Sequence, residues 1–246
     1  MNEQNLEVQK EQDLFNTAHA DKILEATKKA MPHQTEMQVL IKKKLKEIFQ
    51  NIKQDKLEVV ELGTGTGFTS KQILEADQRI KLISVDKELK MVEEAKKNLH
   101  EYLDNGRIEI KEIGALEFLK SFPDNSVDSV ATGFTLHNFF RDYRENTLLE
   151  IFRVLKPGGK FVSADKVMPD DPEEFIREYN WQIESFKNAG LDEVTRQGWM
   201  DHYEHDNRED IIMREADLTN FLKSVGFKNI LINERHHLDV MIVAEK

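Results

Sequence analysis

Three glycines alternate with other residues at the end of a short apolar run, an arrangement that can hold an anionic or nucleotide-like ligand. The run Leu57–Leu62 is followed directly by Gly63, Gly65 and Gly67. Glycine lets the backbone turn sharply and approach a ligand closely, and the free N–H groups at the start of a following helix attract negative charge. The pattern predicts a strand, a tight ligand-binding loop and a helix.

A carboxylate lies nineteen residues beyond Gly67, where Asp86 ends the apolar run 80–85. On the tip of the next strand of such a fold, a carboxylate can accept hydrogen bonds from both hydroxyls of a ribose. The spacing therefore predicts a ligand that carries an unphosphorylated ribose and lies between the glycine loop and Asp86.

Strands and helices are predicted to alternate after residue 56, which is the pattern of a parallel sheet covered on both faces. The expected strands are 57–62, 80–85, 107–112, 127–134 and 160–164, and the expected helices between them are 67–76, 88–102, 116–120 and 144–155. After a last helix at 215–225, strands 228–236 and 238–244 are joined too closely for a crossover helix. These two strands must be antiparallel neighbours.

A cap of helices is predicted in front of the sheet, over residues 1–56. Apolar residues indicate one or two short helices over 13–30, and a further helix over 35–52 has the capping box Thr35 and Gln38. A proline between them should separate the two, because it removes a backbone donor and disfavours helix in the residue before it.

Residues 57–246 are expected to form the main domain, with a helical insertion at about 167–212. Asp171 and Pro172 have the types expected at the start of a helix, which should end at Gly190. A polar stretch rich in aromatic and histidine residues follows it. Segments of this kind can carry substrate specificity.

The glycine loop and three later segments resemble the class I S-adenosylmethionine-dependent methyltransferases. The first motif of that family has G-x-G-x-G spacing and an acidic residue two positions before the first glycine, here Glu61. Asp86, the segment 122–128 and the segment 149–159 continue the match in the same order. The resemblance implies an α/β Rossmann-like fold whose seven-stranded, mostly parallel sheet has an antiparallel last strand, helices on both faces and an N-terminal helical cap. In the family such a cap often closes over the cofactor, and helices that only cover the sheet are the alternative.

The resemblance also implies S-adenosyl-L-methionine as cofactor and S-adenosyl-L-homocysteine as product. Glu61 would support the amino group of the cofactor and Asp86 its ribose. Gly114 stands where the family often has an acidic residue for the adenine amino group, so that contact must come from the backbone or another side chain. The expected cofactor-binding residues are Glu61, Leu62, Gly63, Thr64, Gly65, Gly67, Asp86, Lys87, Gly114, Ala115, Gly133 and Phe134.

The acceptor side is expected between the cap, residues 134–140 and residues 199–205. His137 is the candidate catalytic residue, because an imidazole that titrates near pH ~6.5 can act as a general base for a hydroxyl substrate. A loop histidine bonded to backbone is the alternative. His202, His205 and two neighbouring aspartates have a spacing that could hold a metal. An acidic surface helix is normally solvated, however, so no metal site is predicted.

The formal net charge of −11 argues against a nucleic-acid partner, because phosphate contacts need clustered lysine and arginine. No apolar run approaches the ~18 residues of a membrane span, and no signal peptide is evident, which predicts a cytoplasmic protein without a membrane partner. The expected function is methyl transfer to a small-molecule acceptor by a monomer or homodimer.

Other functions remain open at this point. A tRNA or protein methyltransferase of the same fold is one alternative, and a non-catalytic module that binds S-adenosylmethionine is another. A nicotinamide oxidoreductase is disfavoured, because the glycine spacing differs and no Tyr-x-x-x-Lys pair occurs.

Overall fold

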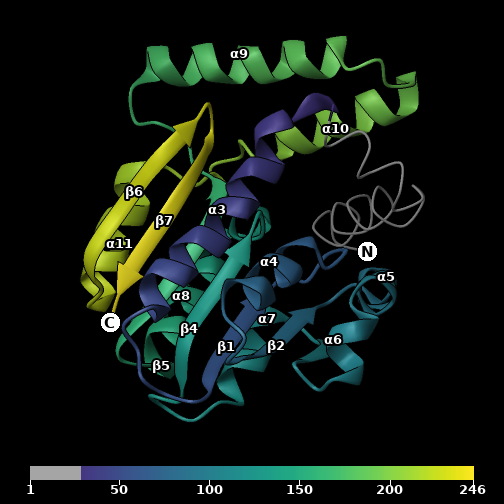
Figure 1. The fold of residues 1–246 in the computed structure, drawn as a ribbon. Helices are drawn as coiled ribbons and strands as arrows, with labels where there is room; N and C mark the ends of the chain where they lie inside the picture. The colour runs from purple at the N-terminus through teal and green to yellow at the C-terminus, as the bar shows by residue number, and fades with distance from the viewer. Residues whose placement is uncertain (1–28) are drawn as a thin grey trace.

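The alternating apolar runs of the sequence form seven strands of one sheet in the computed structural model, which describes residues 29–246 (Figure 1). The strands are β1 (Leu57–Leu62), β2 (Ile80–Asp86), β3 (Ile108–Glu112), β4 (Val127–Gly133), β5 (Leu155–Lys166), β6 (Lys228–His236) and β7 (Asp239–Glu245). Their order in the sheet is β3-β2-β1-β4-β5-β7-β6. Strand β7 is antiparallel to both of its neighbours and the other pairs are parallel, as predicted.

The register of the central strands brings their carboxyl ends to one edge of the sheet. Leu62 at the end of β1 pairs with Val85 of β2 on one side and with Thr132 of β4 on the other. The chain order reverses at β1, with β2 on one side and β4 on the other, and ligands of open α/β sheets bind at such a point. The segments that follow β1, β2 and β4 therefore meet where the sequence predicts a ligand.

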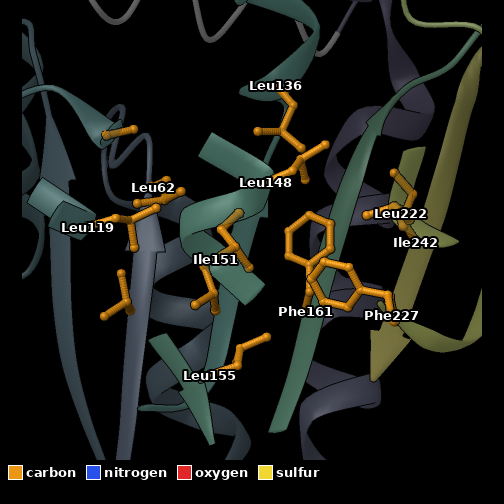
Figure 2. Close-up of a cluster of buried hydrophobic side chains, with 14 of the residues drawn as sticks. Leu62, Leu119, Leu136, Leu148, Ile151, Leu155, Phe161, Leu222, Phe227 and Ile242 are labelled. Atoms are coloured by element: carbon orange, nitrogen blue, oxygen red, sulfur yellow. The ribbon is translucent and has the colours of Figure 1, made fainter. Parts of the chain in front are cut away.

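Six helices of the described chain cover the two faces of the sheet. Helices α3 (Pro32–Phe49), α4 (Phe68–Ala76) and α5 (Leu89–Asn98) share one buried apolar cluster. Helices α7 (Ala115–Lys120), α8 (Arg141–Val154) and α11 (Glu215–Val225) share the other, and Figure 2 shows part of it, with Leu148 and Ile151 of α8 near Phe161 of β5. The apolar spacing of each helix thus points to a sheet face, which is why the sequence predicts these elements well.

The predicted insertion forms two helices, α9 (Pro172–Asn188) and α10 (Glu193–His205), which lie beyond the carboxyl ends of the parallel strands, at the top of Figure 1. The carboxylates of Asp171 and Asp192 cap them, since each accepts a hydrogen bond from a backbone N–H three residues later. Trp199 stacks on Phe186 with ring centroids 6.0 Å apart. The two helices therefore pack on each other through aromatic side chains.

Several predicted boundaries are wrong. Helix α3 runs from Pro32 to Phe49, whereas the prediction was 35–52. It can begin at Pro32 because proline is tolerated in a first turn, whose N–H groups have no intrahelical partner. The helix expected over 88–102 is divided at Leu99, where ψ is 17°, into α5 and the short α6 (His100–Asp104). Strand β5 begins at Leu155, five residues before the expected start, and a register irregularity opposite 127–129 accommodates the extra residues.

Helix α3 packs against α4, β5 and β7, so this part of the predicted cap covers the sheet. The helical region predicted over 13–30 lies almost entirely outside the described residues, and closure of the cap over a cofactor stays a prediction. Among residues 29–246, no helix has both the length and the apolar character that crossing a bilayer would require.

Candidate cofactor and acceptor site

A cavity of about 520 Å³ opens at the carboxyl ends of β1, β2 and β4. This volume lies in the range of small-molecule and cofactor pockets, roughly 300–1,000 Å³. Its walls come from the glycine loop, the end of β2, the turn after β3, the segment after β4, and helices α8 and α10. They consist of Gly63, Gly65, Val85, Asp86, Lys87, Glu88, Met91, Ile113, Gly114, Ala115, Glu117, Gly133, Phe134, Thr135, Asn138, Phe139, Phe140, Tyr143 and His202.

Asp86 presents its carboxylate to the cavity in a fixed orientation. One carboxylate oxygen accepts a hydrogen bond from Gly65 N at 2.8 Å, and the other accepts one from Glu88 N at 3.0 Å. Burial raises the pKa of this carboxyl, although the two backbone donors oppose the shift. Each oxygen keeps a second acceptor position, so the group can still accept hydrogen bonds from a diol.

Glu61 lies behind the glycine loop and is fully buried. One of its oxygens, Oε2, accepts hydrogen bonds from the Ser70 hydroxyl and, at 2.6 Å, from the Ser84 hydroxyl. Burial raises the pKa of Glu61 to about 8, against the lowering effect of these two donors. The other oxygen, Oε1, has no hydrogen-bond partner among the described residues. A buried acceptor of this kind is suited to a cation or a donor that arrives with a ligand.

The glycine loop interlocks with the segment after β4. Gly63 has φ +80°, and a side chain there would overlap the side chain of Thr135, whose hydroxyl donates to Leu62 O at 3.2 Å. Gly65 has φ +51°, and an added Cβ would meet no protein atom within 4 Å. Because Gly65 lines the cavity, that open space is part of the ligand site. Only glycine therefore meets both the backbone and the space requirements.

Glu117 supplies a carboxylate near the glycine that replaces the family's usual acidic residue. A Cβ on Gly114 would overlap the Glu117 carboxylate, so the two occupy one region of the wall. The Tyr143 hydroxyl donates to Glu117 Oε2 at 3.0 Å and accepts from Leu116 N at 3.0 Å. Burial raises the pKa of Tyr143 to about 12, so the phenol stays protonated and holds Glu117 in place.

His137 belongs to a short 3₁₀ turn after β4 (Leu136–Asn138) and is bound to a buried carboxylate. Its Nδ1 lies 2.6 Å from Oδ1 of Asp165, which is fully buried at the end of β5. Backbone N–H groups of Leu136 and Lys166 also donate to Asp165, at 2.9 Å each. The Asp165 carboxylate therefore fixes the imidazole ring. His137 itself is not among the residues that line the cavity.

The prediction of a solvated face for α10 is wrong for His202, and Asp206, which follows the helix directly, is buried as well. The side chains of His202 and Asp206 are 6% and 1% exposed, because the His202 ring packs edge-on against the rings of His137 and Trp199 and Asp206 contacts the end of β5. Asp206 forms an ion pair with Lys166, also buried, whose Nζ lies 3.8 Å from the centre of the Tyr203 ring. Burial alone would raise the pKa of Asp206, but the Lys166 ammonium and the nearby histidines outweigh it and lower the pKa to about 2.

Known proteins are similar to this chain in sequence over part of its length and in fold. Residues 60–163 match the family described as "Methyltransferase domain". A solved structure of a putative S-adenosyl-L-methionine-dependent methyltransferase from Methanococcus maripaludis covers 92% of this chain and 91% of its own, with a TM-score of 0.59 and 17% identity. The CurJ carbon methyltransferase covers 85% of this chain and 53% of its own, with a TM-score of 0.61 and 16% identity. Residues 60–163 are thus similar to a methyltransferase domain, and the chain shares its fold with these solved methyltransferases.

A curated relative supports this assignment over part of its length. The demethylmenaquinone methyltransferase of Leptospira interrogans is 36% identical over 109 residues, which are 44% of this chain and 43% of the relative. The match thus spans less than half the length of that relative. It agrees with the family match over residues 60–163 and leaves the acceptor open.

The structure brings most of the predicted site residues to the cavity. Those that line it are Gly63, Gly65, Asp86, Lys87, Gly114, Ala115, Gly133 and Phe134, whereas Glu61, Leu62, Thr64, Gly67 and His137 lie outside the lining. The predicted acceptor walls at 134–140 and 199–205 meet there, through Phe139 and His202 among others. The cap was predicted to form the third wall of the acceptor site, but its residues before 29 lie outside the described part of the chain.

The sequence analysis missed Tyr143 and Asp165 and did not predict the burial of His202. Tyr143 carries no local signal, since only the docking of α8 on α7 brings its hydroxyl to Glu117. Asp165 did have a signal, because an acidic residue at the end of β5 must lie beside the segment that follows β4. His202 was noticed for its spacing, but its burial follows from the packing of α10 and not from its neighbours in sequence.

Proposed function

We propose that this chain is a methyltransferase that uses S-adenosylmethionine to methylate a small-molecule acceptor and releases S-adenosylhomocysteine. One observation carries the proposal. The oriented carboxylate of Asp86 and a wall of aromatic residues after β4 meet at one cavity beside the glycine loop, and Glu61, two residues before that loop, has a buried carboxylate oxygen without a hydrogen-bond partner among the described residues.

The residues present fit the cofactor. The open space over Gly65 admits the ligand close to the backbone, Asp86 can bind the ribose, and Oε1 of Glu61 supplies the acceptor that an amino group needs. When bound, S-adenosylmethionine supplies an electrophilic methyl group on its sulfonium sulfur. The chain's contribution is to hold the acceptor atom about 3–3.5 Å from that methyl group and in line with it.

The nature of the acceptor is inferred from the wall opposite the cofactor residues. Phe134, Phe139 and Phe140 give this wall an apolar, aromatic character. The net charge of −11 favours a small neutral or cationic acceptor over tRNA. The Leptospira relative is named for demethylmenaquinone, which makes apolar ring compounds the first acceptors to test. The general-base role of His137 stays a prediction, and His202 is the imidazole that faces the cavity.

Calorimetry with S-adenosylmethionine, S-adenosylhomocysteine and NADH tests the cofactor. We expect micromolar binding of the first two ligands, and tighter binding of NADH would refute the assignment. Release of S-adenosylhomocysteine in the presence of phenols, quinols, amines and thiols then tests turnover. Cofactor binding without turnover on any of these compounds would favour a regulatory module or a macromolecular substrate.

A further inference from the structure

Two histidines and an aspartate meet at the acceptor end of the methyltransferase domain. Each of His137, His202 and Asp206 offers one ligand atom, and these atoms lie within 4.8 Å of one another. His202 and Asp206 are four residues apart at the end of α10, whereas His137 comes from the turn after β4. Two imidazoles and a carboxylate form a donor set typical of divalent transition metals.

The surroundings of His137 match those of a metal ligand. Metal-binding histidines usually donate their second ring N–H to a carboxylate, which fixes both the tautomer and the ring orientation. Asp165 accepts from Nδ1 of His137 at 2.6 Å and is itself held by backbone N–H groups. This hydrogen bond leaves Nε2 of His137 as the nitrogen that can bind an ion.

Asp206 likewise has one engaged oxygen and one that is available. Its Oδ2 accepts from Lys166, whereas its buried Oδ1 has no hydrogen-bond partner among the described residues. A carboxylate that binds an ion through one oxygen commonly has its other oxygen hydrogen-bonded. The carboxylates of Asp165 and Asp206, which contact His137 and Lys166, offset the ammonium of Lys166, so a divalent ion does not meet an excess of positive charge.

We propose that His137, His202 and Asp206 bind a divalent transition-metal ion such as Zn²⁺. Ligand atoms of a tetrahedral zinc site lie about 3.4 Å apart, given bonds of ~2.0–2.1 Å. The three ligand atoms lie within 4.8 Å of one another, so each pair needs to close by at most about 1.4 Å. Three protein ligands leave an open coordination position, as in catalytic zinc sites.

The proposed metal site adjoins the cavity, because His202 both belongs to it and lines the cavity. An ion there would bind an oxygen of the acceptor and lower its pKa, which prepares a hydroxyl for methylation. This role rests on the proposed function, whereas the binding of the ion does not. Metal binding and cofactor binding can therefore succeed or fail independently.

The test uses the whole chain, stripped with a chelator and titrated with Zn²⁺ by calorimetry, with metal content measured after dialysis. We expect one Zn²⁺ per chain for the wild type. His137→Gln and His202→Gln should each weaken Zn²⁺ binding at least tenfold, and Asp165→Asn, which removes only the orienting carboxylate, by about 10- to 100-fold. His100→Gln, at an exposed position on α6, is the matched control and should retain the wild-type affinity.

Two further measurements keep the result decisive. Each variant is also unfolded thermally without ligand, since a cooperative transition shows that the fold is intact. If a variant fails to fold, NMR of the wild-type chain is used instead. Zn²⁺ should then shift the imidazole ¹⁵N resonances of His137 and His202. A wild-type chain that retains no Zn²⁺, or folded variants that bind it as tightly as the wild type, would overturn the proposal.

Discussion

The carboxyl group of Glu61 is fully buried, and its burial makes the free energy of unfolding depend on pH. Its pKa is raised from 4.5 to about 8 by burial, so the folded chain holds a proton that the unfolded chain loses above pH 4.5. The stability contribution of this proton is full below pH 4.5 and is lost as pH rises through 8, a change of roughly 3–5 kcal/mol.

We expect Glu61→Gln to remove most of this pH dependence, because the amide cannot ionise. Urea unfolding of the ligand-free chain at pH 5 and pH 8 measures it. Glu58→Gln, on the same strand but partly exposed, is the control and should follow the wild type. If the free energy of unfolding changes between pH 5 and pH 8 by the same amount in the Glu61→Gln variant and the wild type, Glu61 is ionised at neutral pH despite its burial.

Asp86 is expected to determine cofactor affinity. Asp86→Ala removes a charged acceptor for the ribose hydroxyls, at a cost of about 1.5–3 kcal/mol, or roughly 10- to 150-fold in the dissociation constant. It also removes the partner of Gly65 N, so the loop loses support. Calorimetry with S-adenosylhomocysteine measures the change, with Asp55→Ala, an exposed substitution, as the control. An unchanged constant in a folded variant would mean that another group binds the ribose.

At the scale of elements, the loop between β1 and α4 needs glycine for two different reasons. Gly65 leaves space for a ligand, whereas Gly63 avoids contact with a neighbouring side chain. Gly65→Ala places a methyl group in the cavity but against no protein atom, so we expect weaker cofactor binding and a stability cost of only about 1–2 kcal/mol for the left-handed backbone. Gly63→Ala meets the side chain of Thr135 as well, and should lose more stability than Gly65→Ala. Paired unfolding and binding measurements decide this, and equal losses of stability would contradict the interlocked loops.

The ion pair between Lys166 at the end of β5 and Asp206, directly after α10, also joins two elements. Asp206→Asn leaves the buried ammonium of Lys166 without its charged partner, which typically costs about 3–5 kcal/mol. The pKa of Asp206 is lowered to about 2, so the wild-type advantage should persist at pH 5 and fade only as pH falls from 3.8 towards 2. Unfolding of both proteins at pH 7 and pH 3 measures it, with Asp201→Asn, exposed on the same helix, as the control. Equal stabilities at pH 7 would contradict a structural role for the pair.

Elements with a clear apolar period were predicted with accurate bounds, and α11 and β1 agree with the expectation at both ends. The errors occur where tertiary contacts decide. Leu99 is buried against the glycine loop, which divides a helix that local sequence would continue. Pro157 and the two glycines after it indicate a turn in the sequence. In the structure β5 continues through them, because Leu155 and Lys160 on either side both pair with β4. Likewise, the cofactor side of the site follows from local motifs, whereas the acceptor side depends on how α8 and α10 pack.

At the scale of the whole molecule, a bound cofactor joins segments from both halves of the sheet and should stabilise all of it. At 100 times its dissociation constant a ligand adds about 2.7 kcal/mol to the free energy of unfolding, which corresponds to roughly 5–10 °C in a chain of this size. We expect S-adenosylhomocysteine to raise the melting temperature by this amount in thermal denaturation. NADH at the same concentration is the comparison, and an equal shift with NADH would contradict a specific site.

The position of β1 in the middle of the sheet has a consequence for the order in which the protein can be completed during translation. Residues 59–62 pair with 129–132, so the strand that carries the glycine loop lacks one neighbour until some 70 further residues have been made. Contacts between such distant segments form late, and ribosomes add only about 5–20 residues per second. A nascent chain with Gly65 and Asp86 already in place would therefore expose the unpaired edge of β1 for several seconds, and could bind no cofactor until β4 closed the sheet.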